Sequence, residues 1–356
     1  MKMYGISIFL SEEITDETRT YIQEMSNIGF KGIFTSLHIP EDDATLYAKR
    51  LKELGQIAQK LDMKLMVDIS GEALKRAGFS FERLDEILTL GVTGLRMDYA
   101  ISNQAIAEAS QYLTIGLNAS TISAEDVEEL QTFNADFTNF EAWHNYYPRP
   151  ETGLSSQFFN EKNQWLKQSG FRIFAFVPGN QQLRGPLQEG LPTLEKHRYD
   201  NPFSAALDLN ENYQVDGIYV GDPKISKRTI RQFEAYSRDQ ILQLEVADIG
   251  SNYYSKILGE HKNRQDDARD VIRSADARFN KIVTVEPEVL LERKTGSVTI
   301  DNHLYGRYMG EIQITKNDLP ANKKINIAAQ IVTDDISLLK LIKAGRVFNL
   351  IEKGTL

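Results

Sequence analysis

The sequence predicts a (β/α)8 barrel, of class α/β, followed by a smaller, β-rich domain. The first observation is that eight short β-type runs alternate with amphipathic helical stretches over residues 1–241, about the span typical of that fold. The second is the helical spacing of apolar residues between these runs, as at Leu51, Leu54 and Leu61. The third is that no GxGxxG motif follows the first run, which disfavours the competing doubly wound open sheet.

The expected elements of the barrel follow in chain order. Helix starts are indicated by the N-cap residues Thr15, Ser123 and Ser226. Glycines stand near several strand starts, as expected where a helix ends and the chain turns back. The strands are expected at Tyr4–Leu10, Gly32–Leu37, Lys64–Ile69, Gly94–Met97, Leu113–Leu117, Asp136–Phe140, Arg172–Val177 and Gly217–Val220.

The pattern changes after about residue 241. Strand-like segments at Ser297–Ile300, Gly310–Thr315 and Lys324–Val332 are separated by turns that contain Gly, Pro, Asn and Asp. Helical periodicity is confined to Ala268–Ser274 and Asp335–Ala344. We therefore expect a barrel domain over residues 1–241 and a β-rich domain over residues 242–356.

The composition limits the classes of function. The 356 residues carry a net charge of −9, and an acidic surface repels phosphodiester backbones, so no nucleic acid is expected as a partner. No apolar run approaches the roughly 20 residues of a membrane-spanning helix, and no membrane association is expected. The chain has no cysteine, which excludes disulfides and thiolate metal ligands and favours a cytoplasmic location. The oligomeric state is not indicated.

Polar residues gather at the carboxyl ends of the expected strands, where barrel enzymes place their chemistry. No lysine ends a strand, as a Schiff-base aldolase would require, and no GxSxG motif marks a serine nucleophile. The five histidines are scattered, so neither a metal nor another cofactor is expected. Carboxylates remain, and two of them across a scissile bond are the usual apparatus of glycoside hydrolysis.

Three carboxylates are the candidates for catalysis: Asp68 on the third strand, and Asp98 and Glu141 at the carboxyl ends of the fourth and sixth strands. We expect Asp98 and Glu141 to include the general acid, because neither lies beside an obvious turn signal, and we hold Asp68 in reserve. A structural role is the alternative for each, because acids at a barrel rim often bind loop amides or cap helices. Asp222 precedes Pro223, so a turn role is expected for it.

Candidates for substrate binding lie mainly in an aromatic and polar loop, residues 139–154. Aromatic faces stack on sugars, and amides and arginines bind hydroxyls and anions, although the loop could instead pack on its own aromatics. Barrels often bind phosphate after strands seven and eight, and the polar cluster at residues 301–311 is expected to form a further wall of the active site. The candidates are Asn118, Asn139, His144, Tyr146, Arg149, Arg184, Asn302 and Arg307.

Segments along essentially the whole chain resemble one family. They are Tyr4–Phe9, Leu65–Ser70, Gly94–Asp98, Leu117–Ser120, Asn139–Leu154, Leu183–Pro186, Glu189–Glu195 and Asp301–Glu311. They resemble the bacterial 6-phospho-N-acetylmuramidases, formerly described as outer surface proteins. The resemblance implies a barrel followed by a cyclophilin-like β-barrel. It also implies intracellular hydrolysis of N-acetylmuramic acid 6-phosphate linked β-1,4 to N-acetylglucosamine, in the turnover of cell-wall peptidoglycan.

The implied substrate is a small phosphorylated amino-sugar disaccharide that carries a phosphate and a lactyl carboxylate. Arg149, Arg184 and Arg307, from three different loops, could bind these anions despite the net charge of −9. The 2-acetamido group could serve as an internal nucleophile. Two alternatives stay open: a phosphosugar hydrolase or lyase of another specificity, and a non-catalytic carbohydrate- or peptide-binding protein.

Overall fold

The computed structural model describes residues 3–36, 44–70, 84–97, 101–275, 277 and 284–356. The chain forms two compact units, Met1–Ser226 and Lys227–Leu356. Helix α9 (Lys227–Asp239), which the sequence interpretation counted with the barrel, belongs by its contacts to the second unit. Among the described helices, none has the length and apolar character needed to cross a membrane.

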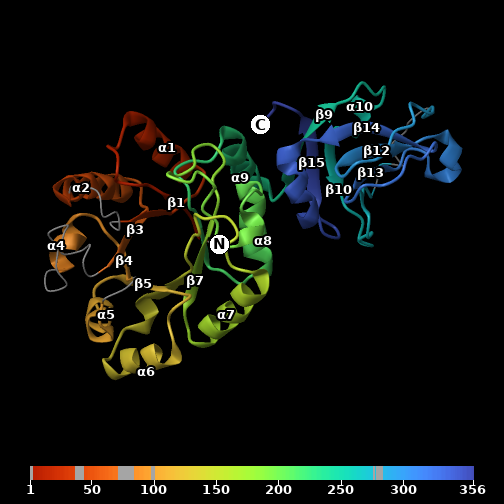
Figure 1. Ribbon diagram of the computed structural model, residues 1–356. Helices are drawn as coiled ribbons and strands as arrows, with labels where there is room; N and C mark the ends of the chain where they lie inside the picture. Colours follow the sequence, from red (N-terminus) through yellow and green to blue (C-terminus); the bar gives the residue numbers. More distant parts are fainter. Residues whose placement is uncertain (1–2, 37–43, 71–83, 98–100, 276, 278–283) are drawn as a thin grey trace. The chain divides into compact units, whose positions relative to one another are not determined.

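The first unit contains a closed barrel of eight parallel strands in the order β1 to β8, as the sequence predicts (Figure 1). Strands β3, β4, β7 and β8 have the predicted bounds, whereas β6 begins at Phe140 and not at Asp136. The strands are β1 (Met3–Ser7), β2 (Gly32–Ser36), β3 (Lys64–Ile69), β4 (Gly94–Met97), β5 (Thr114–Asn118), β6 (Phe140–Trp143), β7 (Arg172–Val177) and β8 (Gly217–Val220).

Helices follow the strands and surround the barrel (Figure 1). Two of the predicted helix starts are confirmed: the Thr15 hydroxyl accepts a hydrogen bond from the Thr18 N–H, and Ser123 and Asp126 form a reciprocal capping box. The described helices of this unit are α1 (Asp16–Asn27), α2 (Ala44–Lys60), α4 (Leu84–Thr89), α5 (Asn103–Ala109), α6 (Ala124–Thr132), α7 (Ser156–Gln168) and α8 (Pro202–Asn212), with short 3-10 helices η2 (Phe137–Asn139) and η3 (Glu195–His197).

Large aromatic side chains fill the barrel interior. Trp143 stacks on Phe174 with 4.6 Å between ring centroids, and Tyr219 packs beside them. Glycines make room for these rings: a Cβ on Gly217 would lie 2.2 Å from Phe174, and one on Gly5 would lie 2.1 Å from Tyr219. The interior is therefore a packed core, and polar chemistry is confined to the two ends of the barrel.

The second unit is built on a sheet of seven described strands in the order β10-β15-β9-β14-β12-β13-β11. Helical structure expected at Ala268–Ser274 is wrong, because β11 pairs with β13 there, and the segment near 335–344 forms a 3-10 helix, η6 (Thr333–Leu341). The strands are β9 (Leu242–Asp248), β10 (Gly259–Lys262), β11 (Val271–Arg273), β12 (Ser297–Asp301), β13 (Ile312–Thr315), β14 (Ile325–Ile331) and β15 (Val347–Glu352), with α10 (Tyr254–Ile257) and the 3-10 helix η5 (His303–Tyr308). The cyclophilin-like character of this unit stays a prediction.

Candidate active site at the carboxyl end of the barrel

A row of polar side chains crosses the carboxyl ends of β2, β3 and β4. Parallel register places Ser36 beside Asp68 and Asp68 beside Arg96. The Ser36 hydroxyl donates to Asp68 Oδ2 over 3.2 Å, and Arg96 Nη1 donates to Asp68 Oδ1 over 2.6 Å. All three side chains are buried, because they continue the inward-facing positions of Phe34 and Met66. We call Ser36, Asp68 and Arg96 the polar row.

The polar row continues into the loop after β6. Arg96 Nη2 donates to the side-chain oxygen of Asn145, and the Asn145 carbonyl accepts a hydrogen bond from the Thr193 hydroxyl over 2.8 Å. Arg96 therefore holds the candidate carboxylate Asp68 at the barrel mouth and also binds Asn145, in the loop of residues 139–154. An arginine and an aspartate that are both buried and paired form a rigid charged group rather than a mobile surface pair.

Tyr146 and Arg184 join two loops above this row. Arg184 Nη1 donates to the Tyr146 hydroxyl over 2.6 Å, and the Arg184 guanidinium lies 4.0 Å from the centroid of the Phe9 ring. Burial raises the pKa of Tyr146, with the charge of Asp68 acting in the same direction and Arg184 opposing it. Among the described residues, no carboxylate forms an ion pair with Arg184, so its charge is available to an anionic ligand.

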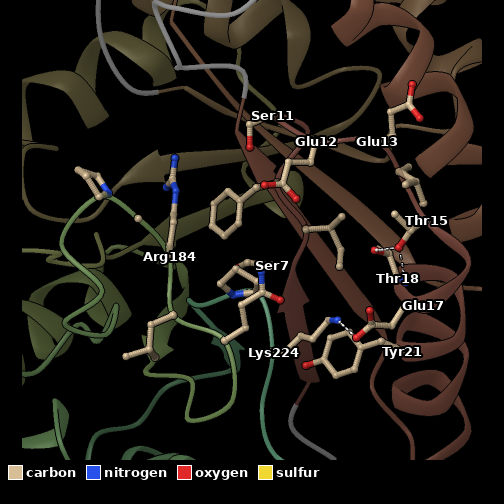
Figure 2. Close-up of a pocket in the computed structure, with 18 residues that line it drawn as sticks. Ser7, Ser11, Glu12, Glu13, Thr15, Glu17, Thr18, Tyr21, Arg184 and Lys224 are labelled. Carbon is tan, nitrogen blue, oxygen red and sulfur yellow. Dashed lines mark hydrogen bonds and ion pairs between the residues drawn. The ribbon is translucent and has the colours of Figure 1, made fainter.

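A pocket of about 570 Å³ opens beside Arg184 (Figure 2). One wall is made by the end of β1 and the segment after it, residues 7–9, 11–15, 17–18 and 21, and the opposite wall is made by residues 182–186 after β7 and 223–224 after β8. Its volume lies in the range of ordinary small-molecule sites. The predicted anion-binding loops after strands seven and eight therefore border a real cavity, although acidic side chains border it as well.

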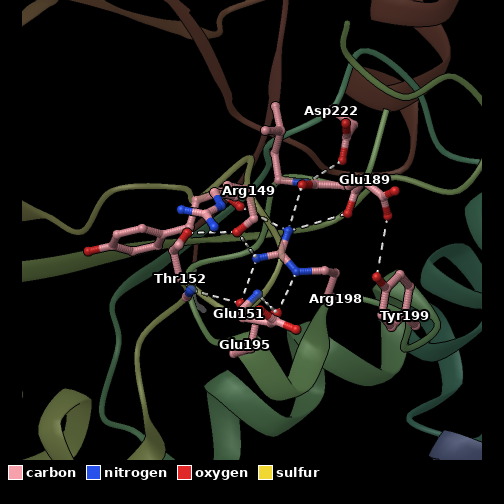
Figure 3. Close-up of polar contacts among 12 residues, drawn as sticks. Arg149, Glu151, Thr152, Glu189, Glu195, Arg198, Tyr199 and Asp222 are labelled. Atoms are coloured by element: carbon pink, nitrogen blue, oxygen red, sulfur yellow. Dashed lines mark hydrogen bonds and ion pairs between the residues drawn. The ribbon is translucent and has the colours of Figure 1, made fainter. Parts of the chain in front are cut away.

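Arg198 holds the loops around the mouth in place (Figure 3). Its buried guanidinium donates to the carbonyls of Tyr147 (2.9 Å) and Gly190 (3.1 Å), in two different loops, and to both carboxylate oxygens of Glu195. Glu195 in turn accepts hydrogen bonds from the N–H groups of Glu151 and Gly153. The hydrogen bonds from the Arg198 side chain are the main reason that the pKa of Glu195 is lowered to about 2. We call Arg198 and Glu195 the loop clasp.

Asp222 has the turn role that the sequence predicts. It is buried, and its carboxylate accepts hydrogen bonds from the N–H groups of Gly179, Arg184 and Leu191, at 2.7, 3.0 and 2.9 Å. These bonds fix the loop after β7 and thereby the backbone position of Arg184.

The position expected for Glu141 and Asn139 is wrong, because β6 starts four residues later than predicted (140 against 136). Asn139 precedes the strand, and its amide donates to the Ser110 carbonyl over 2.9 Å. Glu141 lies near the strand's start, where its carboxylate binds Arg172, the first residue of β7, over 2.8 Å and accepts from Trp143 Nε1 over 2.9 Å. Both residues therefore lie toward the amino-terminal end of the barrel, away from the mouth.

His144 does not face the mouth either. It lies on the outward side of its chain segment, fully buried against α7, where Nε2 contacts the Asn163 side-chain oxygen at 2.7 Å and the ring packs on Phe159. Burial lowers the pKa of His144 to about 4. The expected substrate contact is wrong for this residue, because inward and outward positions alternate and Trp143 takes the inward one.

The remaining barrel candidates are Asn118, Arg149 and Asp98, and the structure describes the first two. Asn118 ends β5 and its side-chain oxygen accepts from the Ser120 N–H over 3.0 Å. Arg149 is exposed, and its carbonyl accepts from Arg198 over 3.2 Å (Figure 3). Asp98 follows β4 directly in the sequence but lies outside the described residues.

Two candidates belong to the second unit. Asn302 is fully buried, and its amide donates to the Lys323 carbonyl and to Asn326 while its oxygen accepts from the Leu304 N–H. Substrate contact by Asn302 is therefore wrong, because no part of it reaches the surface. Arg307 is exposed and donates to the Tyr308 hydroxyl over 2.8 Å, so its predicted role stays a prediction.

Two acids of the polar cluster at residues 301–311 form a buried pair beside Asn302, a pairing that the sequence analysis did not predict. Asp301, the last residue of β12, lies opposite Glu311, whose carbonyl accepts from the Asp301 N–H over 3.0 Å. Asp301 Oδ1 and Glu311 Oε2 are both buried without a hydrogen-bond partner among the described residues. Burial and the charge of Glu311 raise the pKa of Asp301 to about 7. Two acids ten residues apart at the ends of two predicted strands were the available signal.

Other residues missed from the sequence are Arg96, Asn145, Arg198 and Glu195. Arg96 carried a usable signal, because a charged residue inside a buried strand needs a partner, and the neighbouring strand offers Asp68. In the part of the chain that the structure describes, no group of three or more His, Asp or Glu side chains is placed to hold a metal ion.

Comparison with known proteins shows that the chain belongs to the 6-phospho-N-acetylmuramidase family. Residues 4–235 match the family model described as 6-phospho-N-acetylmuramidase, N-terminal, and residues 241–351 match the C-terminal model of the same description. A crystal structure of a conserved protein of unknown function from a locus in Enterococcus faecalis is 56% identical, covers 99% of this chain and 97% of its own, and has a TM-score of 0.92.

An uncharacterized B. cereus protein shares the fold at 24% identity, with 99% of both chains covered and a TM-score of 0.74. The comparison with curated proteins finds no match.

Proposed function

Because the chain belongs to the 6-phospho-N-acetylmuramidase family, we propose that it is a glycoside hydrolase acting in the cytoplasm during peptidoglycan recycling. Its substrate would be N-acetylmuramic acid 6-phosphate linked β-1,4 to N-acetylglucosamine. The observation that carries this proposal is the barrel mouth itself. There, the carboxylate of Asp68 is fixed by Arg96, and Arg184 has no carboxylate ion pair among the described residues. Arg184 can bind the anionic groups of the sugar, and the Asp68 carboxylate can accept a hydrogen bond from it.

The charge of the substrate explains why an acidic protein would keep arginines at this place. The phosphate and the lactyl carboxylate both need charge-assisted hydrogen bonds, and an arginine fork provides two parallel ones. Arg184 is the leading candidate, and the exposed Arg149 is the second. Arg307 remains a candidate from the sequence alone, and an unchanged KM in Arg307→Ala would remove it.

The polar row supports a mechanism in which the substrate's own acetamido group is the nucleophile. Asp68 would accept the acetamido N–H and direct the carbonyl oxygen toward the anomeric carbon as the glycosidic bond breaks. Arg96 and Ser36 already hold this carboxylate, so it needs no rearrangement to act. Asp98 would donate the proton to the leaving oxygen and then activate the water that opens the cyclic intermediate.

The decisive experiment compares the purified full chain on the phosphorylated disaccharide and on the same disaccharide without the 6-phosphate. We expect release of both sugars, and a loss of at least about tenfold in kcat/KM without the phosphate, because hydrogen bonds to charged groups contribute roughly 1.5–3 kcal/mol each. Arg184→Lys, which keeps the charge but not the fork, is the matched variant for Arg184→Ala.

Three results would contradict the proposal. Equal kcat/KM on both disaccharides would remove the phosphate requirement. A product one water molecule lighter than the free sugar, seen by mass spectrometry, would indicate a lyase. Tight binding of the disaccharide without turnover would favour the non-catalytic sugar-binding alternative.

A further inference from the structure

The pocket beside Arg184 is not used by the mechanism above, yet it adjoins the residues that the mechanism does use. Its lining includes Arg184, whose guanidinium also binds the Tyr146 hydroxyl in the loop after β6. A ligand at the mouth that extends past Arg184 would therefore enter this pocket. The volume of about 570 Å³ is more than a single hexose ring needs.

The charges around the pocket distinguish between the two halves of the substrate. Lys224 forms an ion pair with Glu17, so these two charges offset each other. Glu12 and Glu13 are exposed on the same wall as Glu17 and have no ion-pair partner among the described residues. On the opposite wall, Arg184 is the one described cation of the lining that forms no side-chain ion pair. The wall formed after β1 is thus net negative and repels a phosphate or a lactyl carboxylate.

The same wall suits a neutral sugar. Figure 2 shows the Glu12 carboxylate turned toward the side of the pocket where Arg184 lies, and the Glu13 carboxylate turned away from it. Carboxylates accept hydrogen bonds from sugar hydroxyls, and Ser11 and Gln182 add further polar groups. Phe9, Ile14 and Pro186 supply apolar surface for the C–H face of a ring.

We propose that this pocket is the subsite for the neutral leaving sugar, an N-acetylhexosamine, with Glu12 as its hydroxyl acceptor. This inference rests on the proposed function. Arg184 stands at the border of the two subsites, so the anionic sugar lies on the side of the polar row and the neutral sugar on the side of Glu12.

The test separates the two halves of the substrate. The disaccharide fills both subsites, whereas the glycosyl fluoride of N-acetylmuramic acid 6-phosphate has a leaving group too small to occupy the pocket. In Ser11→Trp, which introduces a bulky side chain on the pocket wall, and in Glu12→Gln, we expect kcat/KM on the disaccharide to fall about tenfold or more, and kcat/KM on the fluoride to stay within about twofold. Asp16→Asn removes a nearby exposed charge that does not line the pocket, and should change neither value.

The outcomes distinguish this inference from the proposed function. Equal losses on both substrates, or no loss in either pocket variant at unchanged melting temperature, would overturn the subsite. A wild-type protein that cleaves neither substrate would instead remove the proposed function. In that case, binding of free N-acetylglucosamine, measured by ligand NMR, still tests whether the pocket is a sugar subsite. Binding that disappears in Ser11→Trp supports the inference, and binding that is absent from the wild type or survives in the variant contradicts it.

Discussion

Both ends of the barrel hold a buried carboxylate bound to an arginine, and they differ in what surrounds the pair. At the mouth, Arg96 binds Asp68 and continues to Asn145, so the pair belongs to a chain of polar groups. At the other end, Arg172 binds Glu141 beneath Trp143, next to a cavity of only about 10 Å³. The first arrangement leaves polar groups for a ligand, and the second leaves space for none.

The difference teaches that a buried acid in a barrel is not evidence of catalysis by itself. Burial raises the pKa of Glu141 even though Arg172 opposes the shift, a combination often sought in a general acid. Its neighbours, however, include Met3 and Lys64 at strand starts and the core ring of Tyr219. The end of the strand at which a carboxylate lies is therefore better evidence of a catalytic role than a raised pKa.

The largest expected effect is at the mouth. In Asp68→Asn, we expect kcat on the phosphorylated disaccharide to fall by about 10²–10⁴-fold, because the acetamido group loses its fixed acceptor and Arg96 loses its charged partner. Steady-state kinetics on protein shown by circular dichroism to be folded checks this. A rate within threefold of wild type would mean that the polar row is structural, like its counterpart at the other end.

A third buried acid, Asp301, tests the effect of burial in the second unit. Its pKa is about 7 in the folded chain, against an ordinary value of 3.8, so the folded state holds a proton that the unfolded state has lost between these values. Stability should therefore fall as pH rises from about 4 to 7, by on the order of 4 kcal/mol at most, since each of about three pH units corresponds to about 1.4 kcal/mol.

Denaturant unfolding of the full chain at several pH values measures this effect. In Asp301→Asn, the decline with pH should largely disappear, whereas Asp334→Asn, which removes an exposed acid of the same unit, should retain it. A wild-type transition of the second unit that is equally stable at pH 5 and pH 8 would contradict the prediction. Arg273 and Arg293 both favour the ionised carboxyl and oppose the shift.

The fold was predictable because it depends on patterns that repeat. Eight β-type runs with helical spacing between them were enough for the closed barrel, and Ser123 was predicted as an N-cap, which the structure extends to a capping box with Asp126. The largest error in a strand start was at β6, which follows η2 (Phe137–Asn139), a 3-10 turn with a phenylalanine at its start, so that residues 136–140 resemble a strand in sequence. That shift of four residues moved Asn139 and Glu141 to the wrong end of the barrel.

The site was only partly predictable, because its geometry depends on contacts between loops far apart in sequence. Asp68 and Tyr146 could be selected from their positions after or within strands. The role of Arg198 could not, since it depends on carbonyls from residues 147 and 190 that meet only in the folded chain. His144 was misplaced because Trp143, one position before it, takes the inward side, and the residue types alone did not indicate which of the two neighbours faces the barrel interior.

The loop clasp should give a smaller effect than the acids. In Glu195→Gln, Arg198 keeps its carbonyl partners but loses its charged one, so the loops at the mouth should loosen without unfolding. We expect kcat/KM to fall by roughly fivefold, mainly through KM, because a partly exposed charged hydrogen bond contributes about 1 kcal/mol. Loss concentrated in kcat, with KM unchanged, would show that the clasp does not position the binding loops.

The smallest expected effect on activity is at the amino-terminal end of the barrel. Glu141→Gln keeps an oxygen to accept from Trp143 and removes the buried charge, so kcat should stay within about twofold of wild type. Stability should respond instead, and with a defined sign. Burial raises the pKa of Glu141 above its ordinary value of 4.5, so ionising it costs more in the folded chain than in the unfolded one. Wild type therefore loses stability as pH rises above about 4.5 toward the higher folded pKa, and the variant does not lose this part.

The free energy of unfolding of Glu141→Gln, measured relative to wild type, should thus increase as the pH rises above about 4.5. The gain is limited because Arg172 loses its ion-pair partner in the variant. This loss is small, since the Arg172 side chain is partly exposed to solvent. A large loss of kcat in Glu141→Gln, at retained stability, would instead return this carboxylate to the catalytic machinery. The two ends of the barrel would then not differ in the way that their surroundings indicate.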